Sequence, residues 1–281
     1  MKKITTGLVL AIVLVTLWIV RGPMLRIALS CIGFAAVGEM VRTLDKSGTR
    51  LIKWPPMLFS ALAMPVYVAF GAQAVLPLFM VCAMAAFSVI IFRGEVDLES
   101  MVATIFPMVY PGLMFTLIFP LQDLASPRLA AFALGATFLS AFLTDVFAWG
   151  VGLKFGRHKL IPAISPKKTV EGAVGGLVGA AVSAPISAGI SWLIIRFMVS
   201  AEAAAYPLPN MALLMLVSII AGVVSQYGDL TASAVKRHCG IKDYGNFLPG
   251  HGGMMDRIDS LLFTAVVWHI FFLFCMRAVV L

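Results

Sequence analysis

Long apolar stretches alternate with short polar connections along almost the whole chain. A helix needs about 20 mostly apolar residues to cross the hydrocarbon core of a bilayer. Stretches of suitable length lie at about 4–20, 25–41, 54–71, 74–92, 101–119, 129–150, 172–196, 209–228 and 261–280. The pattern therefore predicts an all-α, polytopic integral membrane protein with about nine transmembrane helices, the first of them retained.

The composition agrees with residence in a membrane. Hydrophobic residues make up 61% of the 281 positions, charged residues only 12%, and the mean hydropathy is +1.00. A soluble domain usually has about 25% charged residues, so the composition argues against a soluble enzyme, a disordered protein and a disulfide scaffold. The four cysteines are far apart and form no CxxC pair, which gives no support to a redox or metal site built on them.

The 21 lysines and arginines are unevenly divided between the two sides of this topology. Sixteen fall in the N-terminal segment and the even-numbered connections, and five fall on the other side. Because Lys and Arg accumulate on the cytoplasmic side, we expect a cytoplasmic N-terminus and an inner, or cytoplasmic, membrane location. The long connections at 151–171 and 229–260 then face the cytosol. We assign residues 1–128 to N-terminal transmembrane helices and residues 129–281 to a catalytic transmembrane region.

The connection at 229–260 mixes carboxylates, cations and glycines. Asp229 ends one predicted span, and Asp256 and Asp259 begin the next, so their carboxylates can hold a metal if the helix ends are neighbours. Mg²⁺ prefers carboxylate oxygens and often keeps substrate phosphates in its shell. Gly252 and Gly253 let the backbone approach a bulky anion. Five side chains of this connection are candidates for binding phosphate: Lys236, Arg237, Lys242, His251 and Arg257. The alternative is an ordinary basic cytosolic loop.

A second polar segment occupies the connection at 151–171. Ser165 followed by Pro166 is typical of an N-cap and a first helical residue, so we expect a helix to begin there. The free amides of a helix N-terminus attract anions, and Lys167 and Lys168 reinforce that attraction. The segment is therefore a candidate phosphate site, with an ordinary capped helix as the alternative.

Two carboxylates lie within apolar stretches, Asp145 and Glu39. A charge inside a membrane is costly and usually faces a polar cavity, so we expect Asp145 to belong to the site. The alternative for Asp145 is a structural ion pair with a nearby Lys or Arg. Glu39 is nearer the end of its stretch, and we expect it to be structural.

Two sets of residues in these segments match sequence motifs. The first is Ser233-Ala-Val-Lys-Arg, then Lys242-Asp243-Tyr-Gly245, then Leu248-Pro249-Gly-His251-Gly252-Gly253-Met-Met-Asp256-Arg257-Ile-Asp259. The second is Ser165-Pro-Lys-Lys168-Thr169-Val-Glu171-Gly172, with Asp145 upstream. Together they resemble the landmarks of the phosphatidate cytidylyltransferase (CDP-diacylglycerol synthase) family, and the resemblance covers roughly residues 140–260.

The resemblance implies a membrane enzyme that condenses CTP with phosphatidate, giving CDP-diacylglycerol and pyrophosphate. It implies Mg²⁺, a second, monovalent cation and a homodimer, with CTP, phosphatidate and membrane lipid as partners and no nucleic acid. The metal ligands are then Asp229 and Asp256, joined by Asp259. The catalytic positions are Lys236, Arg237, Lys242, Asp243, His251 and Arg257, and the substrate-binding positions are Asp145, Ser165, Lys167, Lys168, Thr169, Ser233, Gly252 and Gly253.

Two other functions are compatible with the pattern. A CTP-dependent kinase or cytidylyltransferase that acts on another lipid would share the topology and the metal chemistry. An ion-coupled transporter would use intramembrane carboxylates and broken helices as an ion pathway, although no inverted repeat is evident and the charges cluster on one side. The nucleotide loop GxxxxGK[ST], the zinc motif HExxH and the nucleophile motif GxSxG are absent from the sequence.

Overall fold

The computed structural model describes residues 22–94, 98–245 and 252–280, with side chains as far as residue 274. The predicted span at 4–20 and the candidate phosphate ligand His251 lie outside these residues. Seven helices of the described part are long and apolar enough to cross a membrane, and an eighth apolar helix, Trp54–Phe70, is shorter. The protein is therefore a helical, polytopic membrane protein, as the apolar pattern predicts.

The main helices follow the predicted stretches from 25–41 onward, with α5 covering only the first part of 101–119. They are α2 (Gly22–Lys46), α3 (Trp54–Phe70), α4 (Val75–Phe92), α5 (Leu98–Pro107), α7 (Pro127–Phe155), α8 (Val170–Met198), α10 (Met211–His238) and α11 (Met255–Val280). The shorter elements are η1 (Ala72–Ala74), η2 (Met108–Leu113), α6 (Met114–Thr116), η3 (Phe119–Asp123) and α9 (Ala201–Ala204), together with strands β1 (Lys159–Ile161) and β2 (Ser165–Thr169).

The described residues form two compact units. The first unit consists of the chain up to Phe119 and of Val235–Ile258, and the second consists of Pro120–Ala234 and of the chain from Asp259 onward. Helices α10 and α11 each contribute residues to both units. The assignment of catalysis to residues 129–281 concerns function rather than packing and stays a prediction.

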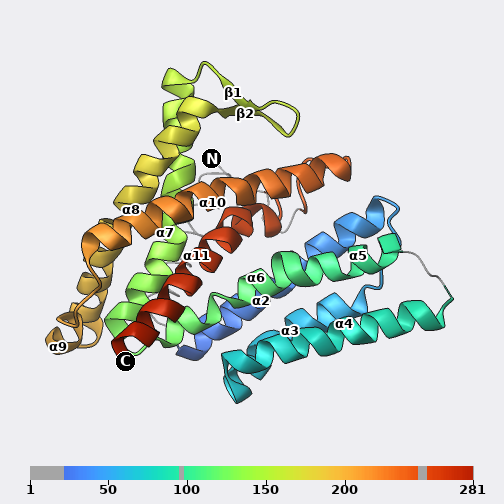
Figure 1. The fold of residues 1–281 in the computed structure, drawn as a ribbon, viewed down its shortest axis with the longest axis horizontal. Helices are drawn as coiled ribbons and strands as arrows, with labels where there is room; N and C mark the ends of the chain where they lie inside the picture. Colours follow the sequence, from blue (N-terminus) through green and yellow to red (C-terminus); the bar gives the residue numbers. More distant parts are fainter. Residues whose placement is uncertain (1–21, 95–97, 246–251, 281) are drawn as a thin grey trace. The chain divides into compact units, whose positions relative to one another are not determined.

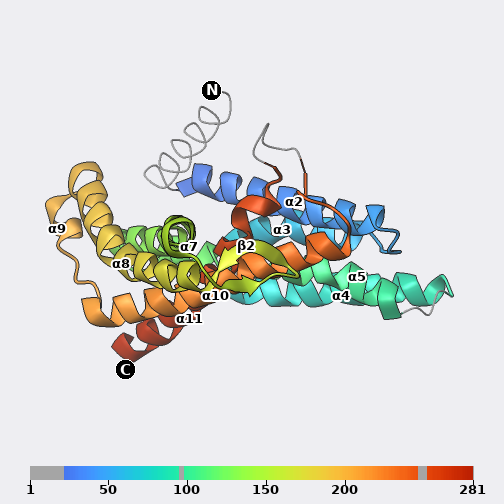
Figure 2. The same cartoon turned by 90° about the horizontal axis from the view of Figure 1, so that it is seen from above.

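In the first unit, α2, α3, α4 and α5 lie side by side (Figure 1 and Figure 2). Their core contains Phe59, which is fully buried and meets the ring of Phe79 edge-on at 5.6 Å between centroids. The stretch predicted at 101–119 is not one regular helix, because α5 continues into the wide turn of η2. Pro107 and Pro111 lie at this break, and each lacks the N–H that would continue a helical ladder.

In the second unit, α7 and α8 pack closely because small residues of α8 face α7. A Cβ built on Gly175 would overlap the side chain of Val151, and one on Gly179 would overlap the backbone of Leu143. Trp268 of α11 is fully buried here and donates from Nε1 to Oγ of Ser140 at 3.2 Å. These contacts hold the α7 segment that carries Asp145 firmly against its neighbours.

The expectation that a helix begins at Ser165 is wrong. Residues 165–169 form strand β2, which pairs antiparallel with β1, Lys159 lying opposite Thr169 (Figure 1). Helix α8 begins at Val170, and Thr169 caps it by accepting from the Gly172 amide at 3.1 Å. Ser165 and Thr169 both have capping side chains, and the pairing of β2 with β1 decides between them because it keeps Ser165 extended.

The predicted loop at 229–260 is also shorter than expected. Helix α10 continues to His238 and α11 begins at Met255, so only residues 239–254 connect them. Helix α7 likewise continues to Phe155. Hydropathy falls where a helix leaves the apolar layer, but its backbone hydrogen bonds can continue through polar residues such as lysine and arginine, which are good helix formers.

Candidate active site

A group of charged and polar side chains from four elements meets in the second unit. Lys168 of β2 and Asp229 of α10 form an ion pair, with Nζ and Oδ2 2.5 Å apart. The carboxylate of Asp145 on α7 interacts electrostatically with both of them. Ser260 of α11 donates from its hydroxyl to Oδ2 of Asp145 at 3.4 Å. The structure thus brings together three predicted site residues, Asp145, Lys168 and Asp229, from separate segments of the sequence.

This group is accessible to a ligand. The side chains of Lys168 and Asp229 are 24% and 29% exposed, and Asp145 is exposed on α7. The buried Ser233 lies one turn from Asp229 on α10 and donates to its Oδ1 at 3.4 Å. Because one lysine faces two carboxylates, the group has more negative than positive charge and can accept a further cation.

The β1–β2 hairpin places Lys168 through close packing around Thr169. A Cβ on Gly156 would overlap the side chain of Thr169, and one on Gly172 would overlap the backbone carbonyl of Ala148. Since Thr169 also caps α8, its role in the described structure is to join the hairpin to the α7–α8 pair. Lys167, which precedes Lys168 in β2, is exposed. Ser165, the first residue of the strand, is half-buried.

Asp256 is the centre of a second group, which lies in the first unit. Its Oδ1 accepts from Nζ of Lys236 at 2.8 Å, and its Oδ2 accepts from the amides of Tyr244 and Gly253 at 2.9 and 3.0 Å. The side chains of Lys236 and Asp256 are 14% and 10% exposed, and the Lys236 ammonium also lies 5.6 Å from the ring centroid of Tyr244. A carboxylate has about four lone-pair sites, so the three donors that come from the described residues still allow Asp256 a further ligand.

The connection before α11 supplies the other predicted residues of the first unit. Gly252 has a φ of +82°, which favours glycine, and a Cβ there would come within 3.2 Å of Oδ2 of Asp256 and 3.5 Å of Oδ1 of Asp243. Three predicted cationic side chains, Arg237, Lys242 and Arg257, are exposed. Gly253 is buried, and the positioning of Asp256 depends directly on its amide.

Asp259, predicted as a metal ligand, lies in the second unit and is 7% exposed. Its Oδ1 accepts from the amide of Ser260 at 2.7 Å. Because Ser260 in turn contacts Asp145, residues 259–260 of α11 lie beside the group in the second unit.

Within residues 22–94, 98–245 and 252–280, no set of three or more His, Cys, Asp or Glu side chains is gathered as a metal site. Mg²⁺ does not need such a set, because it is commonly held by one or two carboxylates and by substrate phosphates. The interacting carboxylates of Asp145 and Asp229, beside a single lysine, fit this kind of binding. The ligand roles of Asp229, Asp256 and Asp259 and the second cation stay predictions.

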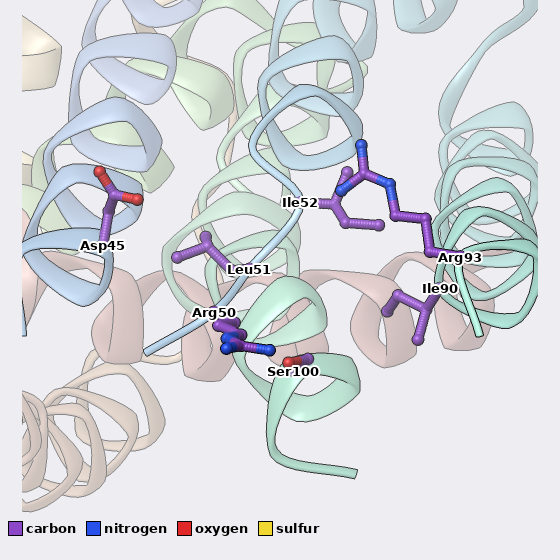
Figure 3. A pocket seen from close by; sticks show the side chains of 7 residues that line it. All are labelled: Asp45, Arg50, Leu51, Ile52, Ile90, Arg93 and Ser100. Atoms are coloured by element: carbon purple, nitrogen blue, oxygen red, sulfur yellow. The ribbon is translucent and has the colours of Figure 1, made fainter. Parts of the chain in front are cut away.

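The first unit also has a cavity of about 270 Å³, and it contains none of the predicted site residues (Figure 3). It is lined by Asp45, Arg50, Leu51, Ile52, Ile90, Arg93 and Ser100. Asp45 is paired there with Lys53, whose Nζ lies 2.7 Å from Oδ2. The predicted site residues therefore belong to polar helix ends and connections rather than to this cavity.

Two residues of these groups were not selected as site residues from the sequence. Ser260 follows the last position of the signature, and only the fold shows that it meets Asp145. Glu39 is expected to be structural, and its carboxylate accepts from the amide of Met255, next to Asp256. The signal in the sequence is a carboxylate in an apolar stretch.

The chain matches the Cytidylyltransferase family over residues 1–275. It is 32% identical to the phosphatidate cytidylyltransferase of Bacillus subtilis (strain 168) over 272 residues, which cover 94% of both chains. It is 41% identical to the phosphatidate cytidylyltransferase of Staphylococcus haemolyticus over 127 residues, 45% of this chain and 44% of that protein. The corresponding match to the Thermotoga maritima protein of the same name is 39% over 133 residues, 47% and 46% of the two chains.

The staphylococcal and Thermotoga matches thus span a little under half of the length of those relatives, whereas the Bacillus match spans nearly all of it. The family resemblance of the motifs is confirmed by these comparisons. The chain belongs to the cytidylyltransferase family.

Proposed function

We propose that this chain transfers the cytidylyl group of CTP to phosphatidate, giving CDP-diacylglycerol and pyrophosphate. The observation that supports this proposal most directly is the meeting of Asp145, Lys168 and Asp229, from three distant segments, in one accessible charged group. Relatives named phosphatidate cytidylyltransferase supply the substrate class.

The chemistry needs charge neutralisation and positioning more than it needs a strong base. A phosphate oxygen of phosphatidate forms a bond to the α-phosphorus of CTP, and the bond from that phosphorus to the β-phosphate oxygen breaks, releasing pyrophosphate. Both reactants are anions, so cationic side chains that bring them together lower the barrier. The phosphomonoester oxygen is already largely anionic near neutral pH and requires little activation.

Lys168 and Lys236 are the two lysines whose settings best suit phosphate binding. Each is paired with one aspartate at short range, Asp229 and Asp256 respectively, and is partly shielded from solvent. A phosphate oxygen can replace the carboxylate as the partner of the ammonium, because charge-assisted hydrogen bonds to phosphate and to carboxylate are similar in strength. The exposed Arg237, Lys242 and Arg257 would add positive charge around the bound anions.

Magnesium is proposed to bind through the carboxylates of Asp145 and Asp229 in the second unit, where Asp259 is a further candidate ligand; Asp256, in the first unit, is a separate candidate. Bound there, it would supply positive charge to the phosphates and to the leaving pyrophosphate. When Lys168 binds a substrate phosphate, its former partner Asp229 still has both carboxylate oxygens available for the metal beside Asp145. A second, monovalent cation and a homodimer belong to the same proposal, as does an active site that faces the cytosol from the inner membrane.

The experiment is a transfer assay with purified protein in detergent micelles containing Mg²⁺ and a panel of lipid acceptors. CTP is labelled at the α-phosphate in one reaction and at the γ-phosphate in the other. We expect the α label in the lipid product only when phosphatidate is supplied, with one pyrophosphate released for each product formed. The Lys46→Ala variant changes an exposed lysine at the end of α2 and serves as the matched control with normal turnover.

Three results would contradict the proposal. Transfer of the γ label to lipid would identify a CTP-dependent kinase. Transfer of the α label to a different lipid, with none to phosphatidate, would show a different acceptor. No turnover in micelles, where no compartments exist, would favour a transporter.

A further inference from the structure

Glu39 is a buried carboxylate of α2 in the first unit. It is 2% exposed, and its Oε2 accepts from the amide of Met255 at 2.8 Å, across 216 positions of the sequence. A carboxylate is seldom buried this completely without a specific partner, because desolvation opposes its charged form. Its partner here is the backbone of the segment that carries Asp256.

This hydrogen bond supplies something that the local sequence lacks. Met255 is the first residue of α11, and the amides of a first helical turn have no partner within their own helix. A Ser, Thr, Asp or Asn just before a helix accepts from the amides of the second or third helical residue, but that position is Met254, whose side chain is not a capping group, and the first amide needs an acceptor from elsewhere. Glu39 provides the acceptor from α2, and its negative charge is favourable at a helix N-terminus.

The same carboxylate is enclosed by two glycines of the connection. A Cβ on Gly245 would lie 2.6 Å from Oε1 of Glu39, and a Cβ on Gly253 would overlap Oε2. The backbone at both positions therefore lies against the Glu39 carboxylate, and at Gly253 a Cβ would also come within 2.8 Å of the Gly245 amide nitrogen. Gly253 is also the residue whose amide donates to Oδ2 of Asp256.

Glu39 and Asp256 therefore fix one stretch of backbone from two sides. Glu39 holds the amide of Met255, and Asp256 holds the amides of Gly253 and Tyr244. If the Glu39 acceptor is removed, the Met255 amide is buried without its partner and the backbone beside Asp256 loses one of its constraints. The Asp256 carboxylate and its Lys236 partner then lose their defined placement.

We infer that Glu39 is a positioning residue for cytidylyl transfer, which fixes the backbone at the start of α11 so that Asp256 and Lys236 are presented in their working geometry. The inference rests on the proposed function for its consequence in catalysis. Its structural part, the restraint of the backbone, does not depend on any substrate.

The test compares three variants of the full chain in detergent micelles. Glu39→Ala removes the acceptor, whereas Glu39→Gln keeps an oxygen that can accept from Met255 and removes the charge. Thr43→Val is the matched control, because Thr43 lies one turn further along α2 and is also buried, at 4% exposure. Hydrogen–deuterium exchange of residues 252–258 is measured without substrate, and kcat and KM are measured separately for CTP and phosphatidate.

We expect Glu39→Ala to speed exchange of the amides of residues 253 and 255 about tenfold. We expect its kcat to fall about 10- to 100-fold, as for a misplaced catalytic group, with each KM changed less than about threefold. Glu39→Gln should restore exchange and kcat to within about threefold of the wild type. Thr43→Val should resemble the wild type in both measurements.

Wild-type exchange and kcat in Glu39→Ala would overturn the inference. So would a folded Glu39→Gln variant as impaired as Glu39→Ala, because the charge rather than the hydrogen bond would then be needed. If Glu39→Ala does not fold, Glu39→Gln still decides, since normal exchange and kcat there support the hydrogen-bond role. A wild-type protein that makes no CDP-diacylglycerol would refute the proposed function. The exchange measurement, made without substrate, would still test whether Glu39 restrains the backbone at the start of α11.

Discussion

The Lys236–Asp256 pair allows stability and catalysis to be separated by a double-mutant cycle. The two charged atoms are 2.8 Å apart and the side chains are at most 14% exposed, so solvent screens the pair only weakly. A hydrogen bond to a charged group typically contributes about 1.5–3 kcal/mol net. Replacing Lys236 by methionine removes this charged partner and leaves Asp256 its two amide donors, so we expect the variant to lose about 1.5–3 kcal/mol of unfolding free energy.

Asp256→Asn perturbs the same pair from the other side. The asparagine oxygen can still accept from the Tyr244 and Gly253 amides, but its NH₂ group then faces the Lys236 ammonium, and two donors oppose each other. We expect a loss of similar size in this variant. The double variant, Lys236→Met with Asp256→Asn, removes both charges and the opposing donors, so its loss should be smaller than the sum of the single losses by about 1–2 kcal/mol.

Catalysis should behave differently from stability in this cycle. Free energies of unfolding are measured by titration with SDS in mixed micelles, and cytidylyl transfer is measured with α-labelled CTP. All three variants should have lost turnover, because each lacks the Lys236 ammonium, the Asp256 carboxylate or both. Additive losses of stability, within about 0.5 kcal/mol, would refute the energetic role of the pair. Turnover near the wild-type level in Asp256→Asn would refute the catalytic role.

Three further predictions concern the second unit and the connection before α11. Lys168→Ala should lower kcat/KM about 10- to 100-fold, because it removes a charge-assisted hydrogen bond to phosphate, and an unchanged value in the transfer assay would contradict that role. Asp229→Asn should raise the Mg²⁺ concentration needed for half-maximal activity, which a magnesium titration at saturating CTP measures; the same midpoint as the wild type would argue against a ligand role. Gly253→Ala should lower the thermal midpoint and turnover together, since its methyl group would overlap Glu39, and a stable, active variant would show that the close approach is not required.

The course of the chain through the membrane could be predicted closely, because it depends on local hydropathy. Each described stretch from 25–41 onward coincides with an apolar helical segment, although the segment at 101–119 is broken near Pro107 and Pro111. The helix ends could not be predicted in the same way. Helix α10 continues to His238 because a helix needs only its own backbone hydrogen bonds, whereas the hydropathy pattern marks only the part of it that is apolar.

The start of α8 shows a different limit. Ser165-Pro166 and Thr169 are both acceptable helix starts by local rules, and the choice between them depends on the pairing of Ser165–Thr169 with residues 159–161. The candidate site shows the same limit with charges. Asp145, Lys168 and Asp229 could each be selected singly from the sequence, but an ion pair depends on distances across segments more than 20 residues apart, which only the fold sets.

The sequence by itself determined that the protein resides in a membrane, that it is helical and that it carries the family's motifs. Composition, apolar pattern and motif spacing are all local properties of the chain. The tertiary structure alone decided which lysine faces which aspartate, where α8 begins and what the buried Glu39 holds. The physical reason is that hydrophobicity is a property of each residue in its local stretch, whereas a hydrogen bond or an ion pair needs two groups within about 3 Å of each other. Glu39 and Met255, which are 216 positions apart, meet only after the chain has folded.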